Sequence, residues 1–154
     1  MPPTPDALKS CALFKDFTDT GLQIIAGIAT ERNYPKGVPL FVENMVADSM
    51  LILTAGRVKL TARNAAGEEV TLGTELNPGD VLGELSLIQP SQRMCTATAA
   101  STGVTAVELR HGDFQRLMAQ KPQACLKLLM AIVGAFGQKV QDSRGALKQL
   151  LSRT

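Results

Sequence analysis

The alternation of apolar and polar positions divides the chain into a helical, a strand-rich and a second helical segment. In residues 1–30 the apolar side chains recur at helical spacing, and Thr18 or Thr20 can cap a helix there. The apolar side of that helix carries Leu22, Ile24, Ile25 and Ile28. In residues 31–110, short apolar and β-branched runs alternate with turn signals roughly every ten residues. This pattern predicts an antiparallel β-roll of the jelly-roll type.

The predicted strands and turns of the roll can be placed along the chain. The clearest strands are residues 51–53, 58–60, 70–72 and 104–109. The turns between them gather proline, glycine, asparagine and aspartate at residues 35–37, 55–56, 64–67 and 77–80. The expected fold is therefore mainly β, with N-terminal helices, one short helix within the roll region and a long helix near the C-terminus.

The last segment, residues 111–154, returns to helical spacing. A short helix is expected over 113–119, and Pro122 stands where a longer helix can begin. The apolar positions of this longer helix follow a 3-4 pattern with a break at Ser143: Leu126, Leu129, Val133, Phe136, Val140, Leu147 and Leu150. Two interpretations stay open, a seam that pairs with another helix or an amphipathic helix packed on its own β-roll.

Composition indicates one ordinary domain with reduced thiols. The 154 residues are 45% hydrophobic, enough to bury a core without a disulfide or a metal. Cys11, Cys95 and Cys125 are dispersed and show no C-x-x-C spacing. The N-terminus lacks the apolar core of a signal peptide, and the most apolar stretch, residues 128–136, is about half as long as a membrane span. We therefore expect a cytoplasmic protein without membrane contact.

One segment, residues 79–96, combines the features of an anion site. A strand is expected to end before Gly83, which permits an abrupt turn, and residues 84–87 can form a single helical turn. The first turn of a helix presents free backbone N–H groups that attract anions. After a short loop Arg93 is expected to open the next strand, and a phosphate would satisfy both its guanidinium and those amides. Glu84 would repel a phosphate, so we expect it to accept a hydrogen bond from a sugar hydroxyl.

With this segment the sequence resembles the cyclic-nucleotide-binding domains of catabolite-activator-type regulators, protein kinase A regulatory subunits and nucleotide-gated channels. The resemblance extends from Leu13-Phe14 to about Val140. Its motifs are an opening hairpin, Lys36-Gly-Val-Pro-Leu-Phe41, a strand with a glycine turn, Asp48-Ser-Met-Leu-Ile-Leu-Thr-Ala-Gly56, and the approach Leu76-Asn-Pro-Gly-Asp80. Gly83-Glu-Leu-Ser-Leu87 then looks like the phosphate-binding cassette, here residues 82–96, and Glu84 and Arg93 have the spacing of kinase-type members.

The resemblance implies a ligand and a role for each residue of the site. Glu84 is expected to hold the ribose 2′-hydroxyl, and Arg93 the phosphate, of a 3′,5′-cyclic mononucleotide. The rest of the ligand-binding set is Gly83, Leu85, Ser86, Met94 and Cys95. The wall for the base is expected at Leu60 and Leu76, and a lid over the base at Phe136, Lys139 and Val140. The C-terminal helix that carries this lid is expected to pass the signal on.

Met94 departs from the pattern of the family. The residue after the arginine is usually small or hydroxylated, and in cGMP-selective members a threonine or serine there contacts the guanine. The side chain of Met94 lacks that hydroxyl. A pocket specifies a base strongly only when a polar partner would otherwise stay unpaired, so we expect cAMP to be favoured over cGMP.

Enzyme chemistry is not expected from this chain. Jelly-roll metalloenzymes of the cupin type need several histidines around a metal, and the sequence has 1 histidine, His111, at a strand-to-helix junction. A Ser–His–Asp triad is not supported by a histidine so placed, and no Walker-type phosphate loop occurs. We therefore expect no catalytic residue, no metal and no cofactor, and a surface or capping role for His111.

The sequence leaves the output partner open. The net charge of +2 gives no nucleic-acid footprint, and the chain ends too soon after Val140 for a helix-turn-helix, so no DNA contact is expected. The expected partners are the cyclic nucleotide and, through the C-terminal helix, a second copy of the chain or a downstream effector. Two alternatives remain: a domain of the same fold that binds no nucleotide and only dimerises or docks, and a regulatory module cut from a longer polypeptide.

Overall fold

The computed structural model describes residues 1–152; residues 153–154, at the end of the predicted segment 111–154, lie outside the described residues. The N-terminal segment forms α1 (Pro5–Leu8), the 3-10 turn η1 (Ala12–Phe14) and α2 (Asp19–Ile28). Of the two candidate caps of α2, Thr18 is the one used, because its Oγ1 accepts a hydrogen bond from the N–H of Gly21 at 3.1 Å.

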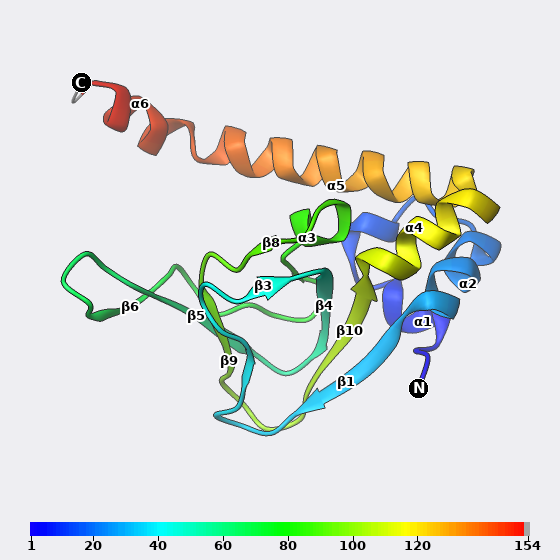
Figure 1. Cartoon of the computed structure of the whole chain (residues 1–154), viewed down its shortest axis with the longest axis horizontal. Coiled ribbons are helices and arrows are strands. Elements are labelled where there is room, and N and C mark those ends of the chain that lie inside the picture. The colour runs from blue at the N-terminus through cyan, green and yellow to red at the C-terminus, as the bar shows by residue number, and fades with distance from the viewer. Residues whose placement is uncertain (153–154) are drawn as a thin grey trace.

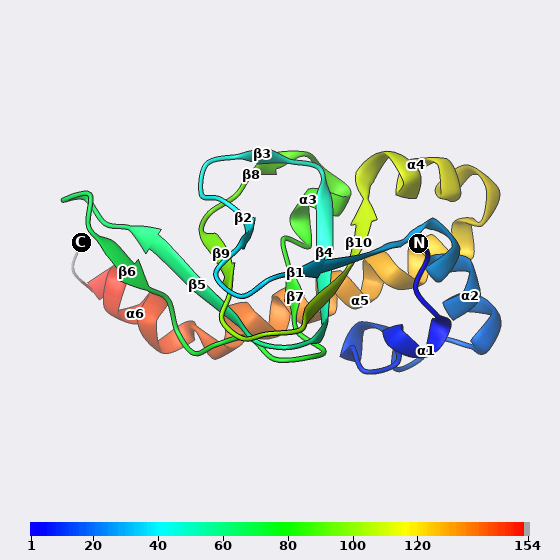
Figure 2. The same cartoon turned by 90° about the horizontal axis from the view of Figure 1, so that it is seen from below.

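The middle of the chain folds as the antiparallel β-roll that the turn spacing predicts (Figures 1 and 2). Its strands are β1 (Thr30–Tyr34), β2 (Pro39–Phe41), β3 (Val46–Ala47), β4 (Ser49–Ala55), β5 (Val58–Arg63), β6 (Glu69–Thr71), β7 (Val81–Leu82), β8 (Ser91–Gln92), β9 (Thr96–Ala99) and β10 (Val104–Arg110). One sheet has the order β1-β10-β4-β7 and another the order β2-β9-β5-β6, while β3 pairs with β8. Each strand predicted from the sequence overlaps one of these, and the fold class is confirmed.

Helices cover one end of the roll and cross its top. The short α3 (Leu85–Ile88) lies between β7 and β8, and after β10 the chain continues through α4 (His111–Gln120), α5 (Pro122–Asp142) and α6 (Arg144–Ser152). The long α5 runs across the upper side of the molecule in Figure 1. The predicted start at Pro122 and break at Ser143 are confirmed, since Ser143 separates α5 from α6 with φ −90° and ψ 2°. No helix within residues 1–152 is long and apolar enough to cross a membrane.

Two apolar clusters fill the part of the chain that the structure describes. One joins α1, η1, α2, α4 and α5 to one face of β4 and β10, and the other fills the roll. The segment from β7 to β9 contributes to both, because Leu82 and Cys95 pack in the roll cluster whereas Leu87 packs in the helical cluster. The candidate anion site is thereby held between two cores, one of which includes α5.

Each of the two interpretations of the C-terminal helix describes one face of α5. Cys125, Leu128 and Ile132 are buried in the helical cluster, at the i, i+3 and i+7 spacing of one helix face. Leu129, one of the positions in the 3-4 pattern, also packs against this cluster, so for this position the interpretation as an amphipathic helix packed on its own domain holds. The exposed apolar face consists of Leu126, Met130, Val133, Phe136 and Val140. Of the other predicted seam positions, Leu147 is exposed, and the side chain of Leu150 lies outside what the structure describes.

Candidate functional site

The cassette is built by a tight turn that only glycine adopts without strain. Gly83 follows β7 with φ +67°, in the left-handed region, and Glu84 then occupies the N-cap position of the single-turn helix α3. The predicted turn and short helix are therefore confirmed. The backbone N–H groups of Glu84 and Leu85 donate no hydrogen bond among the described residues, so the first turn of α3 keeps free donors.

Arg93 lies in the connection between β8 and β9 and does not open a strand as expected. Its backbone is nevertheless fixed, since its N–H donates to the carbonyl of Met45 and its carbonyl accepts from the N–H of Asn44, both at 2.8 Å. This pairing with the chain after β2 turns the Arg93 side chain inward. The side chain is 5% exposed.

Three neighbours hold the guanidinium of Arg93. Nη2 donates to the carbonyl of Ser49 at 2.8 Å, and Nη1 lies 3.5 Å from Oγ of Ser86. The ring of Phe41 stacks on the guanidinium, with Cζ 4.4 Å from the ring centroid. The guanidinium also runs directly over Gly83, where a Cβ would lie 1.8 Å from Nη1. Gly83 therefore serves the site twice, by its turn and by leaving room for Arg93.

The charge of Arg93 has no counter-ion. No carboxylate of residues 1–152 lies within ion-pair distance of it, and its Nε is buried without a hydrogen-bond partner. Glu108, linked to it only through the hydroxyl of Ser49, already pairs with Arg32 and Arg110 at 3.2 and 3.1 Å. Burial lowers the pKa of Arg93 below the usual arginine value, but arginine stays protonated in proteins. A buried cation is costly unless it is paired, so this site favours an anion.

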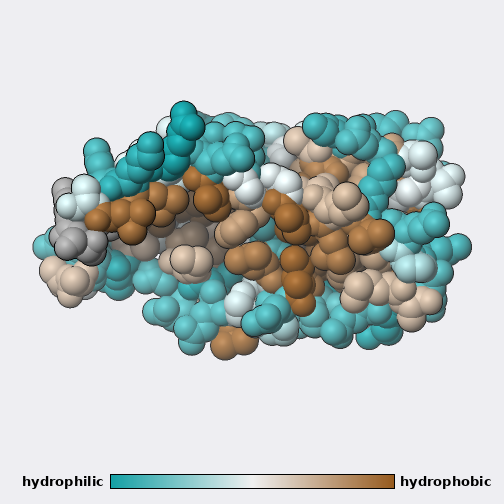
Figure 3. Space-filling model, turned by 90° about the horizontal axis from the view of Figure 1, so that it is seen from above, coloured by the Kyte–Doolittle hydropathy of each residue, from teal (hydrophilic) through white to brown (hydrophobic). Residues whose placement is uncertain are grey.

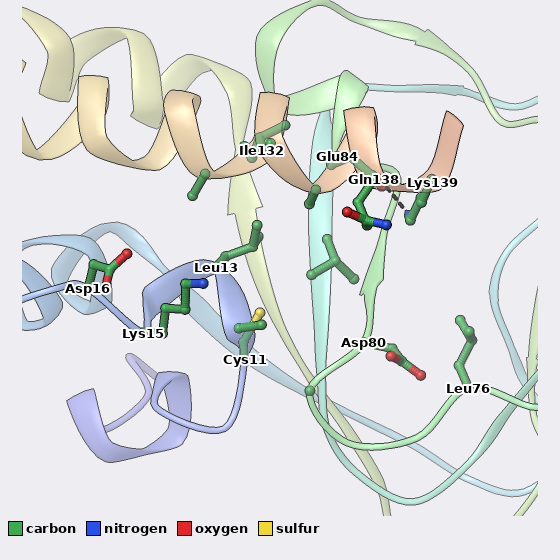
Figure 4. A pocket seen from close by; sticks show the side chains of 16 residues that line it. Cys11, Leu13, Lys15, Asp16, Leu76, Asp80, Glu84, Ile132, Gln138 and Lys139 are labelled. Carbon is green, nitrogen blue, oxygen red and sulfur yellow. Dashed lines mark hydrogen bonds and ion pairs between the residues drawn. The ribbon is translucent and has the colours of Figure 1, made fainter. Parts of the chain in front are cut away.

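Glu84 is held from the other side by the long helix. Lys139 of α5 donates to Oε1 of Glu84 at 2.7 Å, and the two side chains are 61% and 13% exposed, respectively. Both residues line a cleft of about 680 Å³ beneath α5, together with Leu13 of η1, Leu76 and Ile132. Figure 4 shows this arrangement, with the Glu84–Lys139 contact drawn as a dashed line between α5 and the cassette.

The two predicted wall residues pack on the same core, whereas two of the predicted lid residues point away from the site. Leu60 and Leu76, like Cys95 of the cassette, are partly buried against the roll cluster. Phe136 and Val140 lie on the exposed face of α5, 44% and 45% exposed, and only Lys139 of the lid set contacts the cassette.

The remaining cassette side chains divide between the interior and solvent. Ser86 is buried, with its Oγ 2.9 Å from Oγ of Ser91. Leu85 is 47% exposed, and Met94 is 88% exposed. The Met94 side chain therefore points into solvent and away from the interior.

Several residues of the site were missed from the sequence. Phe41 was noted only as the end of a hairpin and Ser49 only as the start of a strand, although both hold Arg93. Ser49 could have been found from the sequence. It directly precedes the apolar run 50–53, and a polar residue buried beside such a run needs a hydrogen-bond partner. His111 begins α4, and its Nδ1 lies 2.6 Å from the carbonyl of Leu87, so it ties α4 to the end of α3.

Comparison with known proteins shows which family this chain resembles. The sequence model described as "Cyclic nucleotide-binding domain" matches residues 31–121. The chain is 32% identical over 100 residues to the "CRP-like cAMP-activated global transcriptional regulator" of Mycobacterium tuberculosis, covering 65% of this chain and 44% of that protein. It is 28% identical over 115 residues to the "Cyclic AMP receptor protein" of Thermus thermophilus, covering 75% of this chain and 52% of that protein. The chain thus spans about half the length of the curated relatives it matches.

A solved structure extends the similarity beyond the roll. The N-terminal domain of a transcriptional regulator from Streptomyces coelicolor A3(2) superimposes with a TM-score of 0.77 at 31% sequence identity, covering 90% of this chain and 95% of that chain. Because residues 31–121 are a smaller share of the chain than this, the shared fold includes flanking helices as well.

Proposed function

The chain belongs to the cyclic nucleotide-binding domain family, and from this membership we propose that it is a non-catalytic sensor of a 3′,5′-cyclic mononucleotide. The observation that carries the proposal is Arg93, a buried cation with an unpartnered Nε and no counter-ion among the described residues. A cyclic phosphate supplies one negative charge and acceptor oxygens in the geometry that a guanidinium binds best.

The parts of the nucleotide are assigned to residues as follows. The cyclic phosphate lies between Arg93 and the free amides at the start of α3, beside Gly83. The ribose 2′-hydroxyl donates to Glu84, the only acidic side chain among the residues of the cassette, 82–96. The base packs on the wall, Leu60 and Leu76, and α5 covers it with Lys139, whereas Phe136 and Val140 of the predicted lid lie on the opposite, exposed face of this helix.

We propose that the site binds cAMP more tightly than cGMP. Met94 offers no hydroxyl to a guanine, and its side chain is 88% exposed, so it supplies no polar contact inside the site. The curated relatives described above are both named for cAMP, which supports the same preference. cGMP remains the second ligand to test.

A ligand panel tests the proposal on the unmodified chain. We expect cAMP to raise the melting temperature more than cGMP, and ATP or a cyclic dinucleotide to have no effect, because the site offers one phosphate position and one ribose acceptor. At a ligand concentration 100 times its Kd the gain in free energy of unfolding is about 2.7 kcal/mol. If cAMP and cGMP both leave the melting temperature unchanged, the alternative of a non-binding interaction domain replaces this proposal.

We propose further that the output of the domain is dimerisation through the exposed apolar face of α5. The face consists of Leu126, Met130, Val133, Phe136 and Val140, which are 57, 68, 65, 44 and 45% exposed. Figure 3 shows that hydrophobic residues gather on this side of the molecule, between hydrophilic ones. Leu126, Val133, Val140 and Leu147 repeat every seven residues, the period at which two helices pair. A second copy of α5 carries the same pattern and fits this face.

A charge in the seam is expected to separate the two copies. Val133→Lys should give the mass of a monomer in sedimentation equilibrium at concentrations where the unmodified chain is a dimer, because two lysines would meet across the seam. The matched control is Gln120→Lys, which adds the same charge on the exposed surface of α4. A wild-type chain that stays monomeric at every concentration points instead to a different protein on α5.

A further inference from the structure

We propose that Lys139 positions the Glu84 carboxylate for the ribose and thereby ties the far half of α5 to the nucleotide site before any nucleotide is bound. This inference rests on the proposed function and names the residue that couples that site to its output helix. The contact itself joins residues 55 positions apart in the sequence, at 2.7 Å.

The first support is that Glu84 has no other fixed partner. Its side chain is 13% exposed and makes no capping hydrogen bond to α3, although it stands at the N-cap. Among the described residues, Lys139 is the only donor that its carboxylate has. Without Lys139 nothing in residues 1–152 sets the direction of this carboxylate.

The second support is that the contact leaves one carboxylate oxygen available. Lys139 takes Oε1, whereas Oε2 has no partner among the described residues and is not sealed from solvent. An ionised carboxylate accepts hydrogen bonds through both oxygens. The ribose hydroxyl can therefore bind Oε2 while Lys139 stays on Oε1, so Lys139 orients the carboxylate and does not compete with the ligand.

The third support is the place of Lys139 along α5. The buried anchors of this helix, Cys125, Leu128 and Ile132, end at its middle, and beyond them the helical cluster is contacted by Ala135, which is only partly buried. The Lys139–Glu84 pair is the only hydrogen bond or ion pair that the structure gives between α5 and the segment from β1 to β10. The second half also contains Gly134 and Gly137, which weaken a helix. Beyond Ala135, this part of α5 therefore depends on the contact with Glu84 for its position over the roll.

The partial burial of the pair separates it from an incidental surface contact. Ion pairs between two exposed side chains contribute little, because water screens them and both chains lose freedom. Here one partner is largely buried and the other reaches it from a separate element. The expected effect of losing the pair is a change in ribose recognition and in the dynamics of α5, and not in the stability of the roll.

The test compares ribose discrimination in three proteins by calorimetry with cAMP and 2′-deoxy-cAMP. The unmodified chain should prefer cAMP by roughly tenfold or more, since a buried acceptor otherwise stays unpaired. Lys139→Met keeps the apolar stem and should lower this preference by up to about fivefold, through weaker binding of cAMP alone. Lys139→Arg keeps a donor on Oε1 and should retain the preference. Gln141→Met, on the exposed surface of α5 and outside the cleft, should behave as the unmodified chain.

Hydrogen exchange without nucleotide gives a second readout. In Lys139→Met the amides of residues 133–142 should lose protection, while those of β4 and β10 should not change, because only the far half of α5 depends on the pair.

The outcomes of these experiments distinguish a failure of the proposed nucleotide binding from a failure of the proposed role of Lys139. If the unmodified chain binds neither nucleotide, the proposed function fails and this inference fails with it. If it binds and discriminates, but Lys139→Met discriminates equally well, only this inference is overturned. Tighter binding of cAMP by Lys139→Met also overturns it, because Lys139 would then compete with the ribose.

Discussion

Arg93→Ala is expected to abolish cyclic-nucleotide binding at ordinary ligand concentrations. Removing one partner of a desolvated charge pair costs about 2–5 kcal/mol, which is roughly a 30- to 5,000-fold loss of affinity. The upper part of this range is expected because the guanidinium is 5% exposed and meets no competing carboxylate among the described residues. Isothermal titration of cAMP into the variant and the unmodified chain measures the change. An unchanged Kd would show that Arg93 does not bind the phosphate.

A volume-conserving variant separates a ligand-binding arginine from a structural one. Arg93→Met fills most of the same space with an apolar chain, which suits a site beside Phe41 and removes a charge that no counter-ion balances. We expect binding to be lost while the free energy of unfolding is kept or rises. Breaking a buried ion pair instead costs about 3–5 kcal/mol, so a loss of that size in urea unfolding would mean that Arg93 serves the fold.

Gly83→Ala is expected to have the next largest effect, on the site and the backbone together. A Cβ at this position would lie 1.8 Å from Nη1 and 2.9 Å from Cζ of Arg93, so the guanidinium must leave its place. The left-handed φ of +67° adds a backbone cost of about 1–2 kcal/mol for a residue with a Cβ. We expect nucleotide affinity to fall by at least tenfold, roughly the loss of one hydrogen bond to a charged group, and the melting temperature to fall as well.

Gly103→Ala is a close control for Gly83→Ala. Gly103 has the same φ of +67°, but a Cβ there meets nothing within 4 Å. It should therefore show a similar loss of stability with unchanged nucleotide affinity. If both variants lose affinity equally, the loss comes from general destabilisation, and the close approach of Arg93 to Gly83 does not matter for binding.

The elements of the fold were predictable because their signals are local. The turn residues after β4 and before β7 lie within a few positions of the strands they end, and Pro122 and Ser143 bound α5 in the same way. The turn at Gly83 and the helical turn after it also follow from adjacent residues, since φ is set by the residue itself. Which side of α5 faces the core was less predictable. Apolar residues occupy much of its circumference, so packing decided that Leu129 lies toward the core while Met130 lies outside.

The sequence by itself determined the β-roll, the position of the cassette and the candidacy of Glu84 and Arg93, because each rests on residues close together along the chain. Only the tertiary structure decided what those side chains contact. Arg93 contacts Ser49, 44 residues away in the sequence, and the register of the strands brings them together. Lys139 contacts Glu84, 55 residues away, because α5 packs on the helical cluster. The absence of a counter-ion for Arg93 among the described residues also depends on tertiary structure, since Glu108 pairs with Arg32 of the neighbouring strand β1 as well as with Arg110 of its own strand. Such distant contacts depend on how the elements pack, and the packing cannot be predicted from local propensity.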